Sequence, residues 1–306
     1  MIKDKIKLAE ILSGIMVIVI IVLLVIGLLY KKDDDSKTSE TSQPETFQPE
    51  SDLPATAFSK DSWSKIASGA KKCINNPNSC PYKVGDEKKV DVGKYGKHIV
   101  RVSNISTPSE CNDNTFSQSA CGFVVEFSDI VTEHNMNPKG EYKGKTYYWG
   151  WNKDGWPASQ MYKFLNDESL NGKGNKELSI INALPRELKK VIIDTKTVSG
   201  HGTEDTDNIV SIDKLYLLAP KEIYGEWYDQ SDTLKDRTRQ LDYYNAEVSE
   251  HDKLKTKKSD SAEIERHYWL RSATATYSFY VASNFGAVLS STPDFKYGVS
   301  PAFRIG

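Results

Sequence analysis

The amino-acid sequence predicts an α+β domain of short antiparallel strands and a few helices, preceded by one transmembrane helix. An apolar run from Ile11 to Tyr30 contains no charged side chain, which indicates a membrane-spanning segment. Beyond residue 60, segments that alternate apolar and polar residues are interspersed with segments that repeat apolar residues every three or four positions. These periods are typical of strands and amphipathic helices, so we expect both kinds of element in a globular domain at 61–306.

The apolar run is typical of an uncleaved signal anchor. At about 1.5 Å per residue, a helix over 11–30 spans about 30 Å, the thickness of the hydrocarbon core of a lipid bilayer. Signal peptides end in a small-residue cleavage site, whereas two lysines follow this run directly. Lys3, Lys5 and Lys7 favour an N-terminus inside the cell. We therefore expect residues 1–10 in the cytoplasm and the C-terminal domain outside.

The same end of the chain has a second interpretation. Leu8, Ala9 and Glu10 resemble the start of type IV pilins and pseudopilins, in which a glutamate near the start of the helix serves assembly. The pilin processing site has Gly followed usually by Phe, where this chain has Lys5 and Ile6. The pilin helix also continues into its globular head, whereas a polar stop follows the apolar run here.

Residues 31–60 are predicted to form a disordered stalk. Ser, Thr, Asp, Glu, Gln and Pro dominate this segment, and few apolar side chains occur in it. Such a composition buries too little surface to offset the entropy cost of ordering. A flexible coil of this length reaches on the order of 30 Å.

The charge composition argues against nucleic acid as a partner. The 306-residue chain has 40 basic and 42 acidic side chains and a net charge of −2, so there is no basic excess to attract phosphates. Its 16 Tyr and 6 Trp are many for this length. Clustered aromatic residues occur both in cores and at ligand-binding surfaces.

All four cysteines, Cys73, Cys80, Cys111 and Cys121, lie beyond the apolar run. Four cysteines permit three pairings, and the short polar segments between neighbours let each close locally. Zinc coordination and free thiols are the alternatives. Zinc ligands usually come as Cys-x(2–4)-Cys pairs, which neither spacing fits. We predict the disulfides Cys73–Cys80 and Cys111–Cys121, which are typical of exported domains.

The domain body alternates short strands and helices. A first helix is expected from Asp61, with Trp63, Ile66, Ala67 and Ala70 on one face. Further helices are expected at Pro157–Asn166 and Pro185–Ile193. Strands are expected at Lys88–Val92, His98–Asn104, Gly122–Phe127, Lys214–Ala219, Tyr268–Ser272, Phe279–Val281, Ala287–Ser290 and Val299–Ile305.

Six short motifs occur in order along this body: Val84-Gly85-Asp86, Trp156-x-x-Ser159-x-Met161-x-x-Phe164-Leu165-Asn166, Leu184-Pro185-x-Glu187-Leu188, Asp213-Lys214-Leu215-x-Leu217-Leu218, Trp269-Leu270-Arg271-Ser272 and Gly298-Val299-x-Pro301-Ala302-Phe303. The ordered set resembles a bacterial surface domain of unknown function, the DUF6273 family, over residues 82–306. The resemblance implies a C-type-lectin-like fold, with the fifth and sixth motifs in its core. Sulfatase-modifying-factor enzymes share that broader fold, so the fold alone does not distinguish a binding protein from an enzyme. The family has no established catalytic residues.

The most conspicuous candidate ligand site is the segment with Trp149, Trp151, Asp154 and Trp156. Flat sugar faces stack on aromatic rings, so three neighbouring tryptophans indicate a carbohydrate-binding platform. The alternative is a turn whose tryptophan side chains pack beneath it.

Other charged and histidine residues give weaker signals. The cluster at 204–208 holds oxygen ligands of the kind calcium prefers, but a solvated acidic loop is the alternative. The histidines, His98, His134, His201, His251 and His267, show no metal-ligand spacing. Arg271 is expected in an interior salt bridge, and Lys253–Lys258 in an exposed loop. No metal, cofactor or catalytic residue is predicted.

The anchor, stalk, cysteines and family resemblance together predict a membrane-anchored cell-surface protein. Its extracellular domain is expected to bind a carbohydrate or protein ligand or to act in adhesion. The first alternative is a pilin-like or envelope assembly subunit. The second is an enzyme acting on envelope polymers, which requires carboxylates gathered in a cleft.

Overall fold

The computed structural model describes residues 57–306, except 175, 202–207, 226–235, 247–248, 259–262 and 275–276. The predicted segments at 1–10 and 11–30, and the stalk up to residue 56, lie outside the described residues. Within the described part of the chain, no helix is both long and apolar enough to cross a bilayer. Phe58 already packs against Trp63 and Tyr82, so the packed part of the chain includes residues before 61.

One five-stranded antiparallel sheet brings together the two ends of the folded domain. Its order is β1 (Glu87–Asp91), β2 (Lys97–Asn104), β3 (Val124–Phe127), β16 (Ala302–Ile305) and β7 (Ile192–Ile193). The predicted antiparallel pair near its edge is confirmed, since Val90 of β1 faces His98 of β2. The predicted strand at Gly122–Phe127 begins two residues late, at Val124.

A second five-stranded sheet has the order β14 (Val288–Ser291), β13 (Phe279–Ala282), β12 (Tyr268–Ala273), β15 (Lys296–Val299) and β4 (Thr132–Asn135). Neighbours are antiparallel except β12 and β15, which are parallel. Every residue of β12 is buried. The described architecture is thus α+β, with mostly antiparallel strands and a few helices, as predicted.

The closing segment passes from the second sheet into the first. The sequence predicts one strand over Val299–Ile305, but the structure ends β15 at Val299 and begins β16 at Ala302. Pro301 lies between them and has no N–H to donate to a strand ladder. Val299 and Phe303, on either side of this break, are both fully buried in the core that joins the two sheets.

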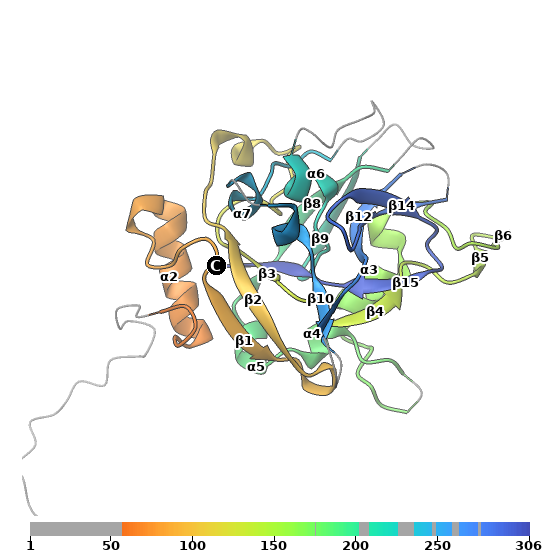
Figure 1. Cartoon of the computed structure of the whole chain (residues 1–306), viewed down its shortest axis with the longest axis horizontal. Helices are drawn as coiled ribbons and strands as arrows, with labels where there is room; N and C mark the ends of the chain where they lie inside the picture. Colours follow the sequence, from red (N-terminus) through yellow and green to blue (C-terminus); the bar gives the residue numbers. More distant parts are fainter. Residues whose placement is uncertain are drawn as a thin grey trace, which may run out of the picture. The chain divides into compact units, whose positions relative to one another are not determined.

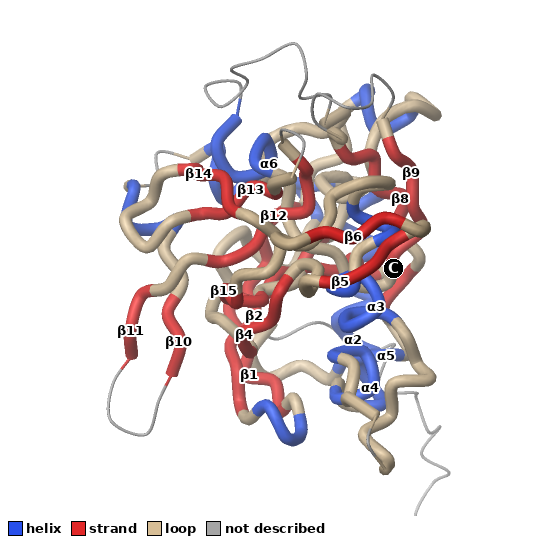
Figure 2. The backbone as a smooth tube through the Cα atoms, turned by 90° about the vertical axis from the view of Figure 1, so that its right-hand side faces the viewer, coloured by secondary structure: helices blue, strands red, loops and turns tan. Residues whose placement is uncertain are grey.

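Three two-stranded sheets are also found among the described residues. They pair β5 (Gly140–Tyr142) with β6 (Lys145–Tyr147), β8 (Thr195–Ser199) with β9 (Ile209–Asp213), and β10 (Thr256–Lys258) with β11 (Glu263–Glu265). Strands β10 and β11 project from the domain (Figure 2). Strands β5 and β6 project from the side opposite helix α2 (Trp63–Asn75), as Figure 1 shows.

Helix α2 is the predicted amphipathic helix, capped by Ser62, whose hydroxyl accepts a hydrogen bond from the Lys65 N–H. The other described α-helices are short: α3 (Gln160–Asn166), α4 (Ile180–Ala183), α5 (Arg186–Lys189), α6 (Pro220–Tyr224) and α7 (Asp242–Asn245). Single 3₁₀ turns lie at η2 (Pro77–Ser79), η3 (Gly93–Tyr95), η4 (Ser109–Asn112), η5 (Trp156–Ala158) and η7 (Glu250–Lys253).

Both predicted helices with an N-terminal proline are shorter than expected. Pro157 lies in η5, and α3 begins only after Ser159, whose hydroxyl accepts a hydrogen bond from the Tyr162 N–H at 3.0 Å. The helix predicted over Pro185–Ile193 ends at Lys189, because the last two residues form β7 and pair with β16. Adjacent β-branched isoleucines favour an extended strand.

The predicted strand at Lys214–Ala219 is buried from Leu215 onward but forms no ladder. Only Tyr216 pairs, through an isolated bridge to Ala302. The carboxamide of Asn166 bonds both the N–H and the C=O of Leu215, each at 2.9 Å. A side chain therefore satisfies backbone groups that a strand would otherwise pair.

Both predicted disulfides, Cys73–Cys80 and Cys111–Cys121, are confirmed. The first joins the end of α2 to the residue after η2, and the second joins η4 to the segment before β3. Closing loops of this size restricts the unfolded chain and contributes roughly 2–3 kcal/mol each to stability.

Several buried ion pairs lie in the interior of the described structure, and two of them test the sequence predictions. Arg271 pairs with Glu222 at 2.6 Å with both side chains fully buried, so the predicted interior salt bridge is confirmed. The prediction of an exposed loop over Lys253–Lys258 is wrong at Lys255, which is 1% exposed and pairs with Glu126 at 2.8 Å. The ion pair compensates for the burial of this lysine.

Candidate functional site

Strands β5 and β6 form a tight hairpin that turns at Lys143 and Gly144. Both residues have positive φ, at 49° and 74°, as two-residue turns that match the strand twist require. The Lys143 ammonium also forms an ion pair with Asp154 at 2.7 Å. The turn fixes the register, which places Lys145 and Tyr147 on one face of the hairpin.

The chain runs from β6 directly into the tryptophan-rich turn at 149–156. Gly150 has a φ of 78°, and a Cβ at this position would lie 2.6 Å from the Asn137 carbonyl oxygen and 3.0 Å from Pro293. Only glycine fits so close an approach at this φ. Asn137 also donates a side-chain hydrogen bond to the Trp151 carbonyl. These contacts hold the turn against the connection between β14 and β15.

The structure separates the three tryptophans of the predicted platform. Trp156 is fully buried, and its Nε1–H donates to Asp213 at 2.9 Å. Trp151 is 4% exposed and stacks on Tyr142, with 4.9 Å between ring centroids. Trp149 is 52% exposed. A platform of three indoles therefore does not form, and two of the three pack beneath the turn, as the alternative proposed.

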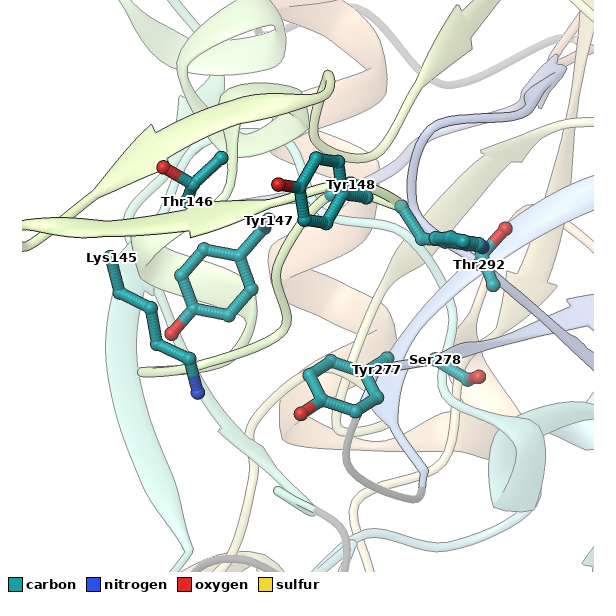
Figure 3. A pocket seen from close by; sticks show the side chains of 9 residues that line it. Lys145, Thr146, Tyr147, Tyr148, Tyr277, Ser278 and Thr292 are labelled. Atoms are coloured by element: carbon teal, nitrogen blue, oxygen red, sulfur yellow. The ribbon is translucent and has the colours of Figure 1, made fainter.

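Trp149 lies beside a pocket of about 640 Å³. Three separate parts of the chain line it: β6 with the turn that follows, the residues before β13, and the connection from β14 to β15. The lining residues are Lys145, Thr146, Tyr147, Tyr148, Trp149, Gly150, Tyr277, Ser278 and Thr292. Figure 3 shows the rings of Tyr147 and Tyr277 extending into the same space from opposite sides.

The pocket combines aromatic surfaces with hydroxyl groups. Tyr148 is 74% exposed and Tyr277 is 47% exposed, so both present apolar surface to solvent. Ser278 and Thr292 add hydroxyl groups, each of which can accept a hydrogen bond. A ligand with flat apolar faces and polar edges suits this arrangement.

Asp154, the fourth predicted ligand residue, does not line the pocket. Its carboxylate accepts a hydrogen bond from the Tyr142 hydroxyl at 2.8 Å, in addition to the ion pair with Lys143. Burial acts to raise the pKa of Asp154, but the bonds from Lys143 and Tyr142 outweigh it, and the pKa lies below its ordinary value. Burial and the bond to Asp154 raise the pKa of Tyr142 to about 12. Asp154 therefore supports the hairpin.

The other candidate sites do not gather into a cluster in the described structure. The calcium hypothesis at 204–208 rests on residues outside the described range, apart from Asn208. The histidines are dispersed: His98 bonds Asp129 at 3.0 Å in the first sheet, and His134 stacks on Phe164. Within the described ranges, no group of three His, Cys, Asp or Glu side chains is placed to hold a metal ion.

Sequence reasoning missed most of the pocket. Tyr147 and Tyr148 directly precede Trp149, so extending the aromatic run upstream would have included them. Tyr277, Ser278 and Thr292 belong to no local motif. The packing of Gly150 against the β14–β15 connection brings Thr292 to the turn. The Asn152 side-chain amide donates to the Ser278 carbonyl at 3.4 Å.

A comparison with known protein families matches residues 129–306, more than half of the chain, to a family described as a domain of unknown function, DUF6273. The match contains the whole pocket and the second sheet. It begins after β3, whereas the resemblance noted above begins at residue 82. No curated protein and no solved structure was found to match the chain. On the strength of the family match, this chain belongs to the DUF6273 family.

Proposed function

We propose that this protein is a cell-surface binding or adhesion protein, and that its domain holds a carbohydrate ligand in the aromatic pocket. The observation that carries the proposal is the exposure of Trp149 and Tyr148 at a pocket edged by hydroxyl groups. Exposed clusters of large apolar side chains mark binding sites in soluble domains. Pyranose rings have apolar faces and hydroxyl edges, which match these two kinds of wall.

We also propose a C-type-lectin-like arrangement for the domain. That fold places the Trp-Leu-Arg-Ser strand and the closing Gly-Val-x-Pro-Ala segment in the core. Two features support the assignment: β12 is buried along its whole length, and Val299 and Phe303 in the closing segment are fully buried. The site lies beside these elements, because Thr292 precedes β15 and Ser278 precedes β13.

The proposed location is the outer face of the cell membrane, with residues 11–30 as the anchor and the residues from 31 to 56, just before the packed Phe58, as the stalk. The uncharged apolar run and the two disulfides support it. Protease added to intact cells is expected to cut the accessible stalk and release a fragment that begins within 31–60. Mass spectrometry of the released fragment checks this, with lysed cells as the control. Full protection of 61–306 on intact cells would contradict the topology.

Replacing Trp149 by alanine is expected to weaken glycan binding by roughly 10- to 30-fold, the effect of removing a central aromatic contact. The side chain is half exposed, so its loss leaves no internal cavity and should leave the melting temperature nearly unchanged. The binding is measured with the purified full-length chain in detergent micelles, first on a glycan array and then by titration with the oligosaccharide that binds.

Phe285→Ala is the matched control. Phe285 is 62% exposed, like Trp149, but does not line the pocket. This variant should bind as tightly as the parent. Equal losses in Trp149→Ala and Phe285→Ala would point to a general effect of surface aromatics and contradict the assignment of the pocket.

A further inference from the structure

The side chains that line the pocket include one cation and no carboxylate. The cation is Lys145, whose ammonium lies 5.3 Å from the centroid of the Tyr147 ring. Among the residues that the structure describes, no carboxylate pairs with it. Figure 3 shows Lys145 and Tyr147 extending to the same side of β6, toward Tyr277, while Thr146 extends to the other.

Two carboxylates that lie within a few residues of the lining segments along the chain, those of Asp154 and Asp294, are already engaged. Asp154 pairs with Lys143 at 2.7 Å. Asp294, in the β14–β15 connection, pairs with Lys139 at 3.5 Å and accepts a hydrogen bond from the Thr292 hydroxyl at 2.8 Å. Each of these carboxylates has its own lysine, so neither neutralises the positive charge of Lys145.

Glu141 is the acidic residue of the β5–β6 hairpin itself, and its side chain lies on the face of the hairpin opposite Lys145. Its register partner across the hairpin is Thr146, whereas the partner of Lys145 is Tyr142. Side chains alternate between the two faces of a strand pair. Glu141 therefore lies on the face opposite Lys145, and no carboxylate of the described residues matches the positive charge that Lys145 brings to the pocket.

We propose that the ligand of this pocket is an acidic glycan, whose carboxylate, sulfate or phosphate group contacts Lys145 while a sugar ring lies against the aromatic wall. The inference rests on the proposed function and names its ligand class. Many sites for neutral sugars bind hydroxyl pairs through carboxylate or carboxamide side chains, and none of the lining residues has one. A lysine ammonium offers three donors and a charge, which complement an anionic group and favour it over a neutral one.

The experiment compares oligosaccharides of equal length that are neutral, carboxylated or sulfated, titrated into the full-length chain in detergent micelles. The acidic ligands should bind about three- to tenfold more tightly than the neutral one, the range of an exposed charge-assisted contact. Lys145→Gln should abolish this preference, so that acidic and neutral oligosaccharides bind this variant equally, and Lys145→Arg should keep the preference. The preference should also shrink as salt is raised, because screening weakens exposed ion pairs.

Lys190→Gln serves as the matched control, since Lys190 is an exposed lysine on the far side of the fold at the end of α5. It should leave the preference intact. If the parent chain binds neutral and acidic oligosaccharides equally, and only Trp149→Ala weakens that binding, the inference about charge is overturned and the proposed function stands. If no oligosaccharide of any class binds the parent chain, the proposed function fails along with this inference.

Discussion

Replacement of Glu222 by alanine is expected to lower the free energy of unfolding by about 3–5 kcal/mol, the cost of breaking a buried ion pair from one side. Its carboxylate accepts two hydrogen bonds from the Arg271 guanidinium, both at 2.6 Å. Neither side chain is exposed to solvent. The alanine variant would leave the guanidinium charged and buried without its counter-ion.

Glu222 also joins two further parts of the chain to β12 and caps its own helix, α6. It accepts hydrogen bonds from the Thr238 hydroxyl at 2.9 Å, from the Ala219 N–H at 2.8 Å and from the Ser119 hydroxyl. Each donor would lose a partner in a site that water does not reach. Since domains are stable by only about 5–15 kcal/mol in total, this variant should fold poorly or be degraded.

Glu187→Ala is the control for the loss of a carboxylate. Glu187 pairs with Lys190 at 3.2 Å on the surface of α5, with more than half of each side chain exposed. Exposed pairs contribute about 0–1 kcal/mol, so urea unfolding of this variant should match the parent. If Glu222→Ala unfolds at the same urea concentration as Glu187→Ala, the buried pair is not what stabilises this part of the core.

A double variant separates the charge from the packing. Glu222→Leu with Arg271→Met removes both charges and keeps apolar volume in the site. It should be more stable than Glu222→Ala, because apolar replacement of a whole buried pair is often neutral or favourable. If the double variant is as unstable as Glu222→Ala, the lost stability comes from the unpaired hydrogen-bond donors around Glu222 and not from the buried, unpaired charge of Arg271.

The sequence predicts an interior position for Arg271 but does not name its partner. In the pattern Trp-Leu-Arg-Ser, two large apolar residues precede the arginine and indicate a strand in the core. A buried arginine then requires a partner, because an unpaired buried charge is costly. Glu222 lies in α6, a short helix with no strong pattern of its own. Its selection depends on how α6 packs against β12, which is a tertiary property.

Local signals account for the elements that were predicted correctly. The periodicity of α2, the alternation of β1 and β2, and the short polar loops of both disulfides act over a few residues, so the sequence displays them directly. The segment Lys214–Ala219 is a contrasting case. Its apolar character predicts burial correctly, but the carboxamide of the distant Asn166 takes the place of a neighbouring strand.

The candidate site likewise has a part that the sequence predicts and a part that depends on tertiary packing. An aromatic run around Trp149 is visible in the sequence, but burial of Trp151 and Trp156 depends on contacts with Tyr142 and Asp213 that no local pattern specifies. Propensity and spacing cannot say which of several tryptophans in a turn faces solvent. The fold decides that by which partner surfaces it brings to the turn.

Replacement of Trp269 by alanine is the second change expected to have a large effect, a loss of about 3–5 kcal/mol in the free energy of unfolding. The indole is 1% exposed in the centre of the second sheet. Its ring lies 5.0 Å from that of Tyr297, and its Nε1–H donates to the His134 carbonyl at 2.9 Å. Alanine would leave a cavity among side chains from β4, β12 and β15, and one buried carbonyl would lose its donor.

The matched comparison uses the same substitution at tryptophans of different burial. Trp149→Ala should stay within about 0.5 kcal/mol of the parent, as surface changes usually do. Trp151→Ala should be clearly destabilising, because that ring is 4% exposed and packed on Tyr142.

Urea unfolding of the full-length chain, followed by circular dichroism, measures these differences. The Trp269→Ala and Trp151→Ala variants should unfold at much lower urea concentrations than Trp149→Ala. If Trp269→Ala unfolds like the parent while Trp149→Ala collapses, core and surface are assigned the wrong way round. The aromatic pocket would then be part of the core and unable to bind a ligand.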